Sequence, residues 1–233
     1  MNCALITGGL GFIGSNLVKL LLKKKVVKKC VILDSYTGYI NPLSDSYSDL
    51  RKYRFRDFKN ISIERGTAQD FRLTYKILKK YKPSMIYHTA AVPLSKVENL
   101  SANESRKGSV DTTTNLLECI NFFKNNNKKY RLKRFVYFSS SMVYGDFKKN
   151  KAFEKDILNP KEIYGTMKLA GEIITKGMCK QYNIPYTIIR PSAAYGPTDM
   201  NQRVTQIFLE KAIKGETLII NGKDEKLDFT FVE

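Results

Sequence analysis

Short apolar runs alternate with longer amphipathic stretches along most of this chain of 233 residues. Six of the runs have the length and flanking turn residues of buried strands, at residues 2–7, 30–33, 61–64, 85–88, 134–138 and 186–190. Four stretches with a helical period lie between them, at residues 12–25, 72–81, 110–123 and about 160–182. Strands that alternate with helices in this way predict an α/β fold, with a doubly wound, mostly parallel sheet covered by helices on both faces.

The pattern also predicts which face of the first helix is buried and where the last helix begins. One face of the first helical stretch carries the apolar side chains Ile13, Leu17, Leu20 and Leu21. That face is predicted to pack against the sheet. The last helix is expected to start near Pro160, because the fixed φ of proline suits a first helical turn.

A glycine-rich turn separates the first strand from the first helix. Gly8, Gly11 and Gly14 are spaced so that backbone N–H groups can approach a pyrophosphate at the positive end of that helix. Asp34 ends the second strand, twenty residues beyond Gly14, where a carboxylate can bind the hydroxyls of an adenosine ribose. Glycines alone also fit a tight turn that binds nothing, but their place between a strand and a helix predicts a Rossmann-like dinucleotide site.

The charge of Asp34 also bears on which dinucleotide binds. A carboxylate at this position accepts hydrogen bonds from a free ribose diol and repels the additional phosphate of NADP. NAD is therefore the expected cofactor. Arg51, Arg54 and Arg56 follow after a loop and leave open the alternative that positive charge reaches the adenosine.

A second group of polar residues follows the fifth strand. Residues 139–141 are three serines at its carboxyl end, and Tyr164 and Lys168 lie four residues apart on the next helix. A nearby cation lowers the pKa of a phenol, so this arrangement suits abstraction of a proton from an alcohol. The same spacing recurs after Tyr75 and Tyr144, for which a surface or core role is the better interpretation. The place of Tyr164 on the helix after the serine-bearing strand is what distinguishes it.

The composition, 42% hydrophobic, fits a protein with one full-sized core. No stretch is long enough to span a bilayer, and a cytoplasmic location is expected. The cysteines are far apart and form no C-x-x-C pair, so neither a metal site nor a disulfide framework is expected. They are Cys3, Cys30, Cys119 and Cys179. The single histidine, His88, ends a buried strand, and a packed, hydrogen-bonded role is favoured over a catalytic one.

The formal net charge of +18 raises the question of a polyanionic partner. The lysines are scattered over many elements, for example at residues 23–25, 79–80 and 128–129, and lack the interleaved aromatic residues of a platform for single-stranded nucleic acid. Solvated surfaces are the favoured interpretation, and RNA binding is kept as a second class of function. The positive field would also attract a nucleotide substrate.

Seven short segments occur in a characteristic order. They are residues 7–14 (TGGLGFIG), Asp34, residues 88–91 (HTAA), residues 115–118 (NLLE), residues 139–145 (SSSMVYG), residues 164–168 (YGTMK) and residues 190–197 (RPSAAYGP). In these segments the whole chain resembles the extended short-chain dehydrogenase/reductases of the NAD-dependent nucleotide-sugar epimerase/dehydratase family. The resemblance implies a Rossmann-like NAD-binding domain at residues 1–191 and the beginning of an incomplete substrate-binding lobe at residues 192–233.

The resemblance also implies roles for the residues at matching positions. Ser140 would be the catalytic hydroxyl, Tyr164 the base, and Lys168 the residue that holds the nicotinamide ribose and lowers the tyrosine pKa. The expected cofactor-binding residues are Gly8, Gly11, Phe12, Ile13, Gly14, Asp34, Ser35, Ala68, Ala90, Ala91, Tyr164, Lys168 and Pro191. The expected substrate-binding residues are Ser141, Ala193 and Arg203.

The residues after Ser140 help to separate the reactions of the family. Dehydratases usually carry an Asp-Glu pair where this chain has Ser141 and Met142, and the decarboxylating branch usually has a glutamate at the second of these positions. We therefore expect a 4-epimerase that oxidises the sugar 4-hydroxyl transiently, with a UDP-sugar as the most suitable substrate. Dehydratase, decarboxylase and reductase activities, or a non-catalytic NAD- or RNA-binding role, remain alternatives. A homodimer is expected from the family.

Several positions depart from the usual pattern of the family. They are Thr67, Ser109, Thr112, Ala193 and Leu227. These departures affect the expected contacts with adenine and with the sugar nucleotide more than the NAD fingerprint itself.

Overall fold

The computed structural model describes residues 2–36, 53–92, 101–146, 151–199, 203–220 and 227–233. Its central sheet has six strands, all parallel, in the order β3-β2-β1-β4-β5-β6. These strands are β1 (Cys3–Thr7), β2 (Lys29–Asp34), β3 (Ile61–Arg65), β4 (Met85–His88), β5 (Arg134–Phe138) and β6 (Tyr186–Ile189). The predicted fold class is confirmed. The strand order reverses between β1 and β4, which is where ligands bind in doubly wound sheets.

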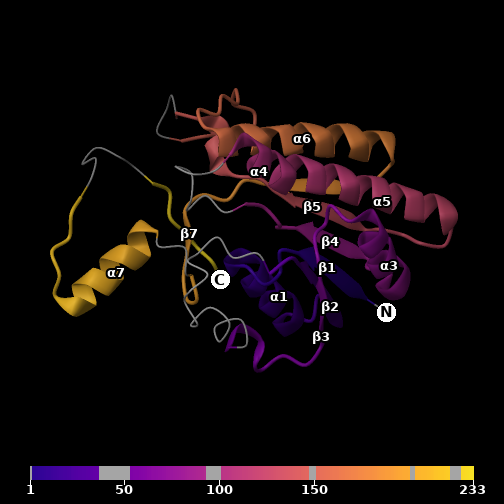
Figure 1. Cartoon of the computed structure of the whole chain (residues 1–233), viewed down its shortest axis with the longest axis horizontal. Coiled ribbons are helices and arrows are strands. Elements are labelled where there is room, and N and C mark those ends of the chain that lie inside the picture. The colour runs from indigo at the N-terminus through magenta and orange to yellow at the C-terminus, as the bar shows by residue number, and fades with distance from the viewer. Residues whose placement is uncertain (1, 37–52, 93–100, 147–150, 200–202, 221–226) are drawn as a thin grey trace.

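Helices cover both faces of this sheet. They are α1 (Phe12–Lys23), α3 (Phe71–Tyr81), α4 (Ala102–Arg106), the π-helical segment η2 (Lys107–Asp111), α5 (Thr112–Asn126), the 3₁₀ turn η3 (Ser141–Tyr144), α6 (Ile163–Gln181) and α7 (Val204–Lys214). Figure 1 shows α4, α5 and α6 together along one side of the sheet, with α1 away from them. The helix predicted at residues 110–123 is thus the main part of a longer run that begins at α4.

Strand β1 divides the core into two layers. All five of its residues are buried, and their side chains alternate between the faces of the sheet. Cys3 and Leu5 belong to the cluster that α3, α5 and α6 cover, while Ala4 and Ile6 belong to the cluster beneath α1. A strand buried on both faces reads as a continuous apolar run, which is the pattern seen in the sequence.

The predicted inward face of α1 is confirmed in part, since Leu21 is buried and Leu17 packs against the same cluster, and the predicted start of α6 at Pro160 is wrong. The face of α1 that packs inward carries Gly14, Val18 and Leu21, whereas Leu20 is 44% exposed. Gly14 lies on this inward side because it packs directly against the backbone of Gly8 and Gly9. Helix α6 begins at Ile163, so Pro160 lies outside it, and the intervening backbone is still extended at Glu162.

The last part of the chain adds elements outside the six-stranded sheet. Strands β7 (Ala194–Tyr195) and β8 (Thr230–Phe231) form a parallel two-stranded sheet. Helix α7 has no buried residue, and Figure 1 shows it on the far side of β7 from the six-stranded sheet. Apolar side chains such as Ile213 (84% exposed) face solvent here. The division into a domain at 1–191 and a lobe at 192–233 stays a prediction.

No helix among the described residues has both the length and the apolar character needed to cross a membrane. Within the same part of the chain, no group of three or more His, Cys, Asp or Glu side chains could hold a metal ion.

Candidate functional site

The glycine turn is built so tightly that side chains cannot replace its hydrogens. Gly8 has a φ of +69°, and a Cβ there would lie 2.7 Å from Cα of Ala90, just past β4. A Cβ on Gly14 would collide with the carbonyl oxygen of Gly8 and lie 2.8 Å from Cα of Gly9. The result is a backbone cradle at the point where the strand order reverses, next to the N-terminus of α1. Its shape and its N–H groups fit the pyrophosphate of a dinucleotide.

Asp34 braces this turn from the end of β2. One carboxylate oxygen accepts a hydrogen bond of 3.0 Å from the backbone N–H of Leu10, and the other accepts one of 2.9 Å from the N–H of Tyr36. Each oxygen keeps a second lone pair with which it can accept a hydroxyl hydrogen. The position therefore fits the ribose contact predicted from the sequence. Ser35, also predicted at the cofactor site, follows directly in the chain.

The sequence left open whether nearby arginines could bind the additional phosphate of NADP. The two of these arginines that the structure describes have other partners. Arg54 is 5% exposed, and its guanidinium donates to the carbonyl oxygens of Leu10 at 2.6 Å and Thr198 at 2.5 Å. Arg56 forms an ion pair of 3.4 Å with Asp57. The third arginine, Arg51, lies outside the described residues. These contacts support NAD as the better fit.

The remaining cofactor candidates lie around the same end of the sheet. Ala68 is buried and its carbonyl oxygen accepts a hydrogen bond of 2.5 Å from the side-chain amide of Asn115. The residues Phe12 and Ile13 open α1, Ala90 and Ala91 follow β4, and Pro191 follows β6. Asn115 was noted in the sequence only as part of a motif, and its bridge to the loop after β3 could not be read from spacing.

The tyrosine and lysine on α6 lie against the end of β5. Lys168 is 2% exposed, and its Nζ donates a hydrogen bond of 2.7 Å to the carbonyl oxygen of Phe138. The same Nζ lies 5.8 Å from the centre of the Tyr164 ring. Gly165 lets the first turn of α6 approach η3, since a Cβ there would lie 2.7 Å from the carbonyl oxygen of Met142. The structure thus brings the helix of both residues next to the turn that follows Ser140.

Burial dominates the electrostatics of this pair. Burial lowers the pKa of Lys168 to about 7, against the opposing charge of Glu172. Desolvation also raises the pKa of Tyr164 to about 12, although the positive charge of Arg203 opposes it. Burial decides the pKa of Tyr164 here, and the expectation that Lys168 lowers this pKa stays a prediction. A lysine that is itself easily deprotonated supplies little positive charge to its neighbour.

Ser140 and the substrate candidates lie at the mouth of this region. Ser140 caps η3, and its Oγ accepts a hydrogen bond of 3.2 Å from the N–H of Met142. The N–H of Ser141 donates to the carbonyl oxygen of Pro191 at 3.0 Å. Ala193 directly precedes β7. Arg203 directly precedes α7, and its guanidinium donates a hydrogen bond of 3.0 Å to the carbonyl oxygen of Ala194 in β7.

His88 is fully buried and has partners on both ring nitrogens. Nδ1 lies 2.6 Å from the hydroxyl of Thr7, and Nε2 lies 3.1 Å from that of Thr113. The Thr113 hydroxyl donates to the carbonyl oxygen of Ser109, so it accepts from Nε2–H, and this assigns the tautomer. Burial, followed by the charge of Lys168, lowers the pKa of His88 to about 3. The interpretation of His88 as a packed, neutral residue is confirmed.

The other two tyrosines with the same spacing have structural surroundings. Tyr75 packs between α3 and α5, against the rings of Phe71 and Phe122. Tyr144 accepts a hydrogen bond of 2.8 Å from Arg190. Spacing alone would have chosen three candidate sites, and the fold distinguishes one of them.

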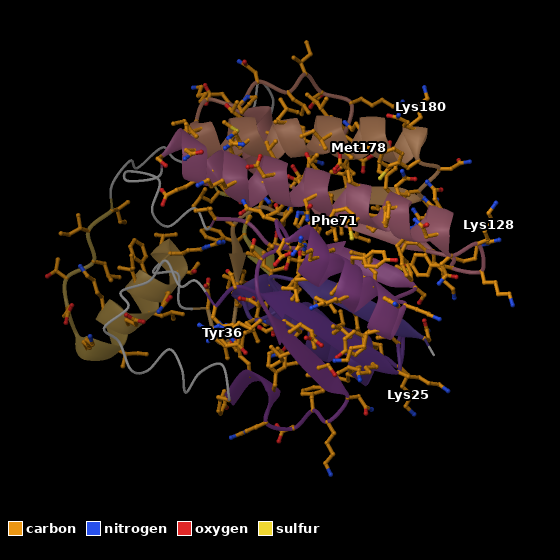
Figure 2. All side chains as sticks on the ribbon, turned by 45° about the vertical axis from the view of Figure 1, so that its right-hand side comes forward. Lys25, Tyr36, Phe71, Lys128, Met178 and Lys180 are labelled. Carbon is orange, nitrogen blue, oxygen red and sulfur yellow. The ribbon has the colours of Figure 1, made fainter. Side chains whose placement is uncertain are left out.

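The positive charge is spread over separate elements. Figure 2 shows Lys25 after α1, Lys128 after α5 and Lys180 in α6, each at a different place on the periphery. All three are exposed. This distribution agrees with solvated surfaces.

Comparison with known proteins agrees with the dinucleotide site described above. The family of NAD dependent epimerases/dehydratases matches residues 4–233. The chain belongs to this family. NAD, the cofactor expected from the sequence, is thus the cofactor of the family.

Relatives with different reactions resemble the chain to a similar degree. A dTDP-D-glucose 4,6-dehydratase of Dictyostelium discoideum is 30% identical over 94% of the chain, which covers 50% of that protein. A UDP-glucuronic acid 4-epimerase from Bacillus cereus, solved with UDP-glucuronic acid and NAD, superposes with a TM-score of 0.83 at 25% identity, over 99% of this chain and 69% of the other. A UDP-glucose 4-epimerase from Thermotoga maritima, solved with UDP-glucose, has a TM-score of 0.77 at 25% identity, over 99% and 69%. Family members therefore include both epimerases and dehydratases.

Proposed function

We propose that this protein is a nucleotide-sugar 4-epimerase. The observation that carries the proposal is the placement of Tyr164 and Lys168 on α6 against the turn of Ser140, with Ser141 and Met142 at the two positions that follow. Neither of these two side chains can act as the additional acid and base that elimination of water requires. Oxidation and reduction at one carbon of the sugar needs only Tyr164, Lys168 and Ser140 beside the cofactor.

The residues divide the work as follows. NAD, when bound, supplies reversible oxidation of the sugar carbon that bears the hydroxyl. The phenol oxygen of Tyr164 takes the proton from that hydroxyl and later gives it back, while the hydroxyl of Ser140 hydrogen-bonds to the same oxygen. The keto-sugar turns over between the two proton transfers, so carbon 4 would be reduced on its opposite face and its configuration would invert, while the proton returns to the oxygen.

Charge must be supplied to Tyr164 for this step. Its pKa of about 12 in the protein without ligands is too high for a base at neutral pH. A protonated Lys168, whose Nζ lies 5.8 Å from the ring centre, would lower it, as would the guanidinium of Arg203. Binding of the anionic cofactor and substrate favours the protonated lysine by the same rule.

A dehydratase is the second candidate, since a 4,6-dehydratase is among the relatives at 30% identity. A purely RNA-binding role is the third, supported by the net charge of +18.

Within the favoured function we propose a UDP-sugar as substrate, the class bound by both solved epimerases above. We also propose a cytoplasmic homodimer through α5 and α6, where Ile173 is 62% exposed on the outer side of α6.

Product analysis tests the proposal. The purified chain is incubated with UDP-glucose, UDP-galactose or UDP-glucuronic acid, with and without added NAD, and the sugars are followed by NMR. Interconversion of 4-epimers by the wild type and its loss in Tyr164→Phe, but not in Tyr75→Phe, is the expected result. A 4-keto-6-deoxy product would identify a dehydratase. Steeply salt-dependent RNA binding without any response to sugar nucleotides would favour the third role.

A further inference from the structure

A fully buried carboxylate lies on the same helix as the proposed catalytic pair. Glu172 is 0% exposed and follows Tyr164 and Lys168 by eight and four residues, which places all three along one side of α6. A buried carboxylate is costly to desolvate unless it is paired and hydrogen-bonded.

Its partner comes from the end of β6. Arg190 donates from Nε to one oxygen of Glu172 at 2.8 Å and from Nη2 to the other at 2.7 Å. A bidentate pair of this kind fixes direction as well as distance. Lys176 lies 3.5 Å from the carboxylate but is half exposed, so it contributes less.

The same guanidinium reaches a third element. Nη1 of Arg190 donates a hydrogen bond of 2.8 Å to the hydroxyl of Tyr144, and the guanidinium carbon lies 4.9 Å from the centre of that ring. Tyr144 is the last residue of η3, the turn that Ser140 caps. One arginine therefore connects α6, the end of β6 and the turn of the catalytic serine.

We propose that Glu172 and Arg190 are positioning residues, which hold η3 in register against the N-terminal half of α6. The inference rests on the proposed function for the roles of Ser140, Tyr164 and Lys168. The contribution of the Glu172–Arg190 pair to folding stability would not explain the arrangement, because a buried ion pair seldom stabilises a fold more than apolar side chains of the same volume. The chemistry that does need it is proton transfer between groups on two elements, where a displacement of about 1 Å can reduce the rate a hundredfold.

The pair also affects the charge of the site. Lys168 is faced by His88 from β4, the ring of Tyr137 from β5, and Tyr164 and Glu172 from its own helix. Glu172 is the negative group among these, and its charge raises the pKa of Lys168 against the effect of burial. Burial raises the pKa of the Glu172 carboxyl, but the hydrogen bonds and charge of Arg190, together with the charge of Lys176, outweigh burial and lower that pKa below its ordinary value. Removing the carboxylate charge should therefore make Lys168 harder to protonate.

The variant that tests this is Glu172→Gln, which keeps the volume and removes the charge. The expected result is a fall in kcat for 4-epimerisation of between about tenfold and a hundredfold, with KM for the UDP-sugar and Kd for NAD changed much less. The alkaline limb of the pH–rate profile should also move to lower pH, because Lys168 loses its proton earlier. Lys180→Gln, at an exposed lysine near the end of the same helix, is the matched control and should leave both kcat and the profile unchanged.

A second variant covers the case in which Glu172→Gln does not fold. Tyr144→Phe removes only the hydroxyl that Arg190 binds and leaves the ion pair intact, so it should fold and lower kcat by a smaller factor. Crystal structures of the folded variants should show η3 displaced relative to α6 while the sheet is unchanged. Wild-type kcat and an unmoved η3 in either variant would overturn the inference. A wild-type protein that turns over no sugar nucleotide would instead refute the proposed function, and the crystal structures would still decide the positioning role.

Discussion

Lys168 and Phe138 join the helix of the candidate site to the strand that precedes its serine. The Nζ of Lys168 donates a hydrogen bond of 2.7 Å to the main-chain carbonyl oxygen of Phe138, although the side chain is 2% exposed. One carbonyl oxygen does not replace the hydration of an ammonium group, and the pKa of Lys168 accordingly falls to about 7. The folded protein therefore holds this residue close to the point of losing its proton.

Replacing Lys168 by methionine should change the pH dependence of stability. Its folded pKa of about 7 is below the ordinary 10.5, so between these values the unfolded chain binds more protons, and the wild type loses stability as pH falls. Methionine cannot titrate, so Lys168→Met should gain stability relative to wild type on going from pH 10.5 to pH 7. The limit is about 5 kcal/mol at about 1.4 kcal/mol per pKa unit. Urea unfolding without cofactor at both pH values measures it, and an equal difference at both would contradict the shift.

His88 should titrate far below an ordinary histidine. Its folded pKa is about 3 and its ordinary value 6.5, so the unfolded chain alone binds the proton between these values and stability is lost as pH falls through them. Because this is the only histidine, its imidazole signals in NMR can be assigned without ambiguity. His88→Gln should remove this part of the acid sensitivity. An imidazole that titrates near pH 6.5 in the folded protein would show that the buried arrangement is wrong.

Asp34→Asn should weaken NAD binding by about tenfold and reduce the preference over NADP. The change keeps the shape and the acceptor oxygen that can serve one backbone N–H, but removes the negative charge that favours a diol over a phosphate. Calorimetric titration of both cofactors measures the two affinities. Asp57→Asn is the control, since that exposed carboxylate pairs with Arg56 on the surface. Unchanged affinity in Asp34→Asn would exclude the ribose contact.

Gly14→Ala should abolish NAD binding. The added methyl group would collide with the carbonyl oxygen of Gly8, which is backbone and cannot move aside without opening the cradle. Gly177→Ala is the matched control in α6, where nothing lies within 4 Å of the new Cβ and the helix should gain up to about 1 kcal/mol. Thermal unfolding with and without NAD separates the two effects. A Gly14→Ala protein that NAD still stabilises would contradict the proposed cradle.

The strands were predictable because a buried parallel sheet leaves a direct pattern. Cys30 to Leu33 are apolar without interruption since both of their faces are covered, and all six predicted strands occur. The inward face of α1 was predictable from hydrophobicity only in part. Leu21 is buried as the pattern indicates, whereas Gly14 and Val18 also face inward and Leu20 is left exposed.

The candidate catalytic residues were predictable from the sequence, but their electrostatic surroundings and the residues that position them were not. Spacing and order along the chain located Tyr164 and Lys168, but the pKa of Tyr164 depends on burial, which spacing does not reveal. The pairing of Glu172 with Arg190 joins residues eighteen positions apart on different elements. Opposite charges at that separation occur throughout a chain with 40 basic and 22 acidic residues, so only the folded structure could select this pair.

The position of a deuterium label tests the central claim most directly. UDP-glucose and dTDP-glucose deuterated at carbon 4 are incubated with the purified chain, and NMR locates the label in the product. Transient oxidation at a single carbon predicts a galactose-configured product with deuterium still at carbon 4. A 4-keto-6-deoxy sugar with deuterium at carbon 6, the carbon from which water has been lost, would contradict the epimerase account.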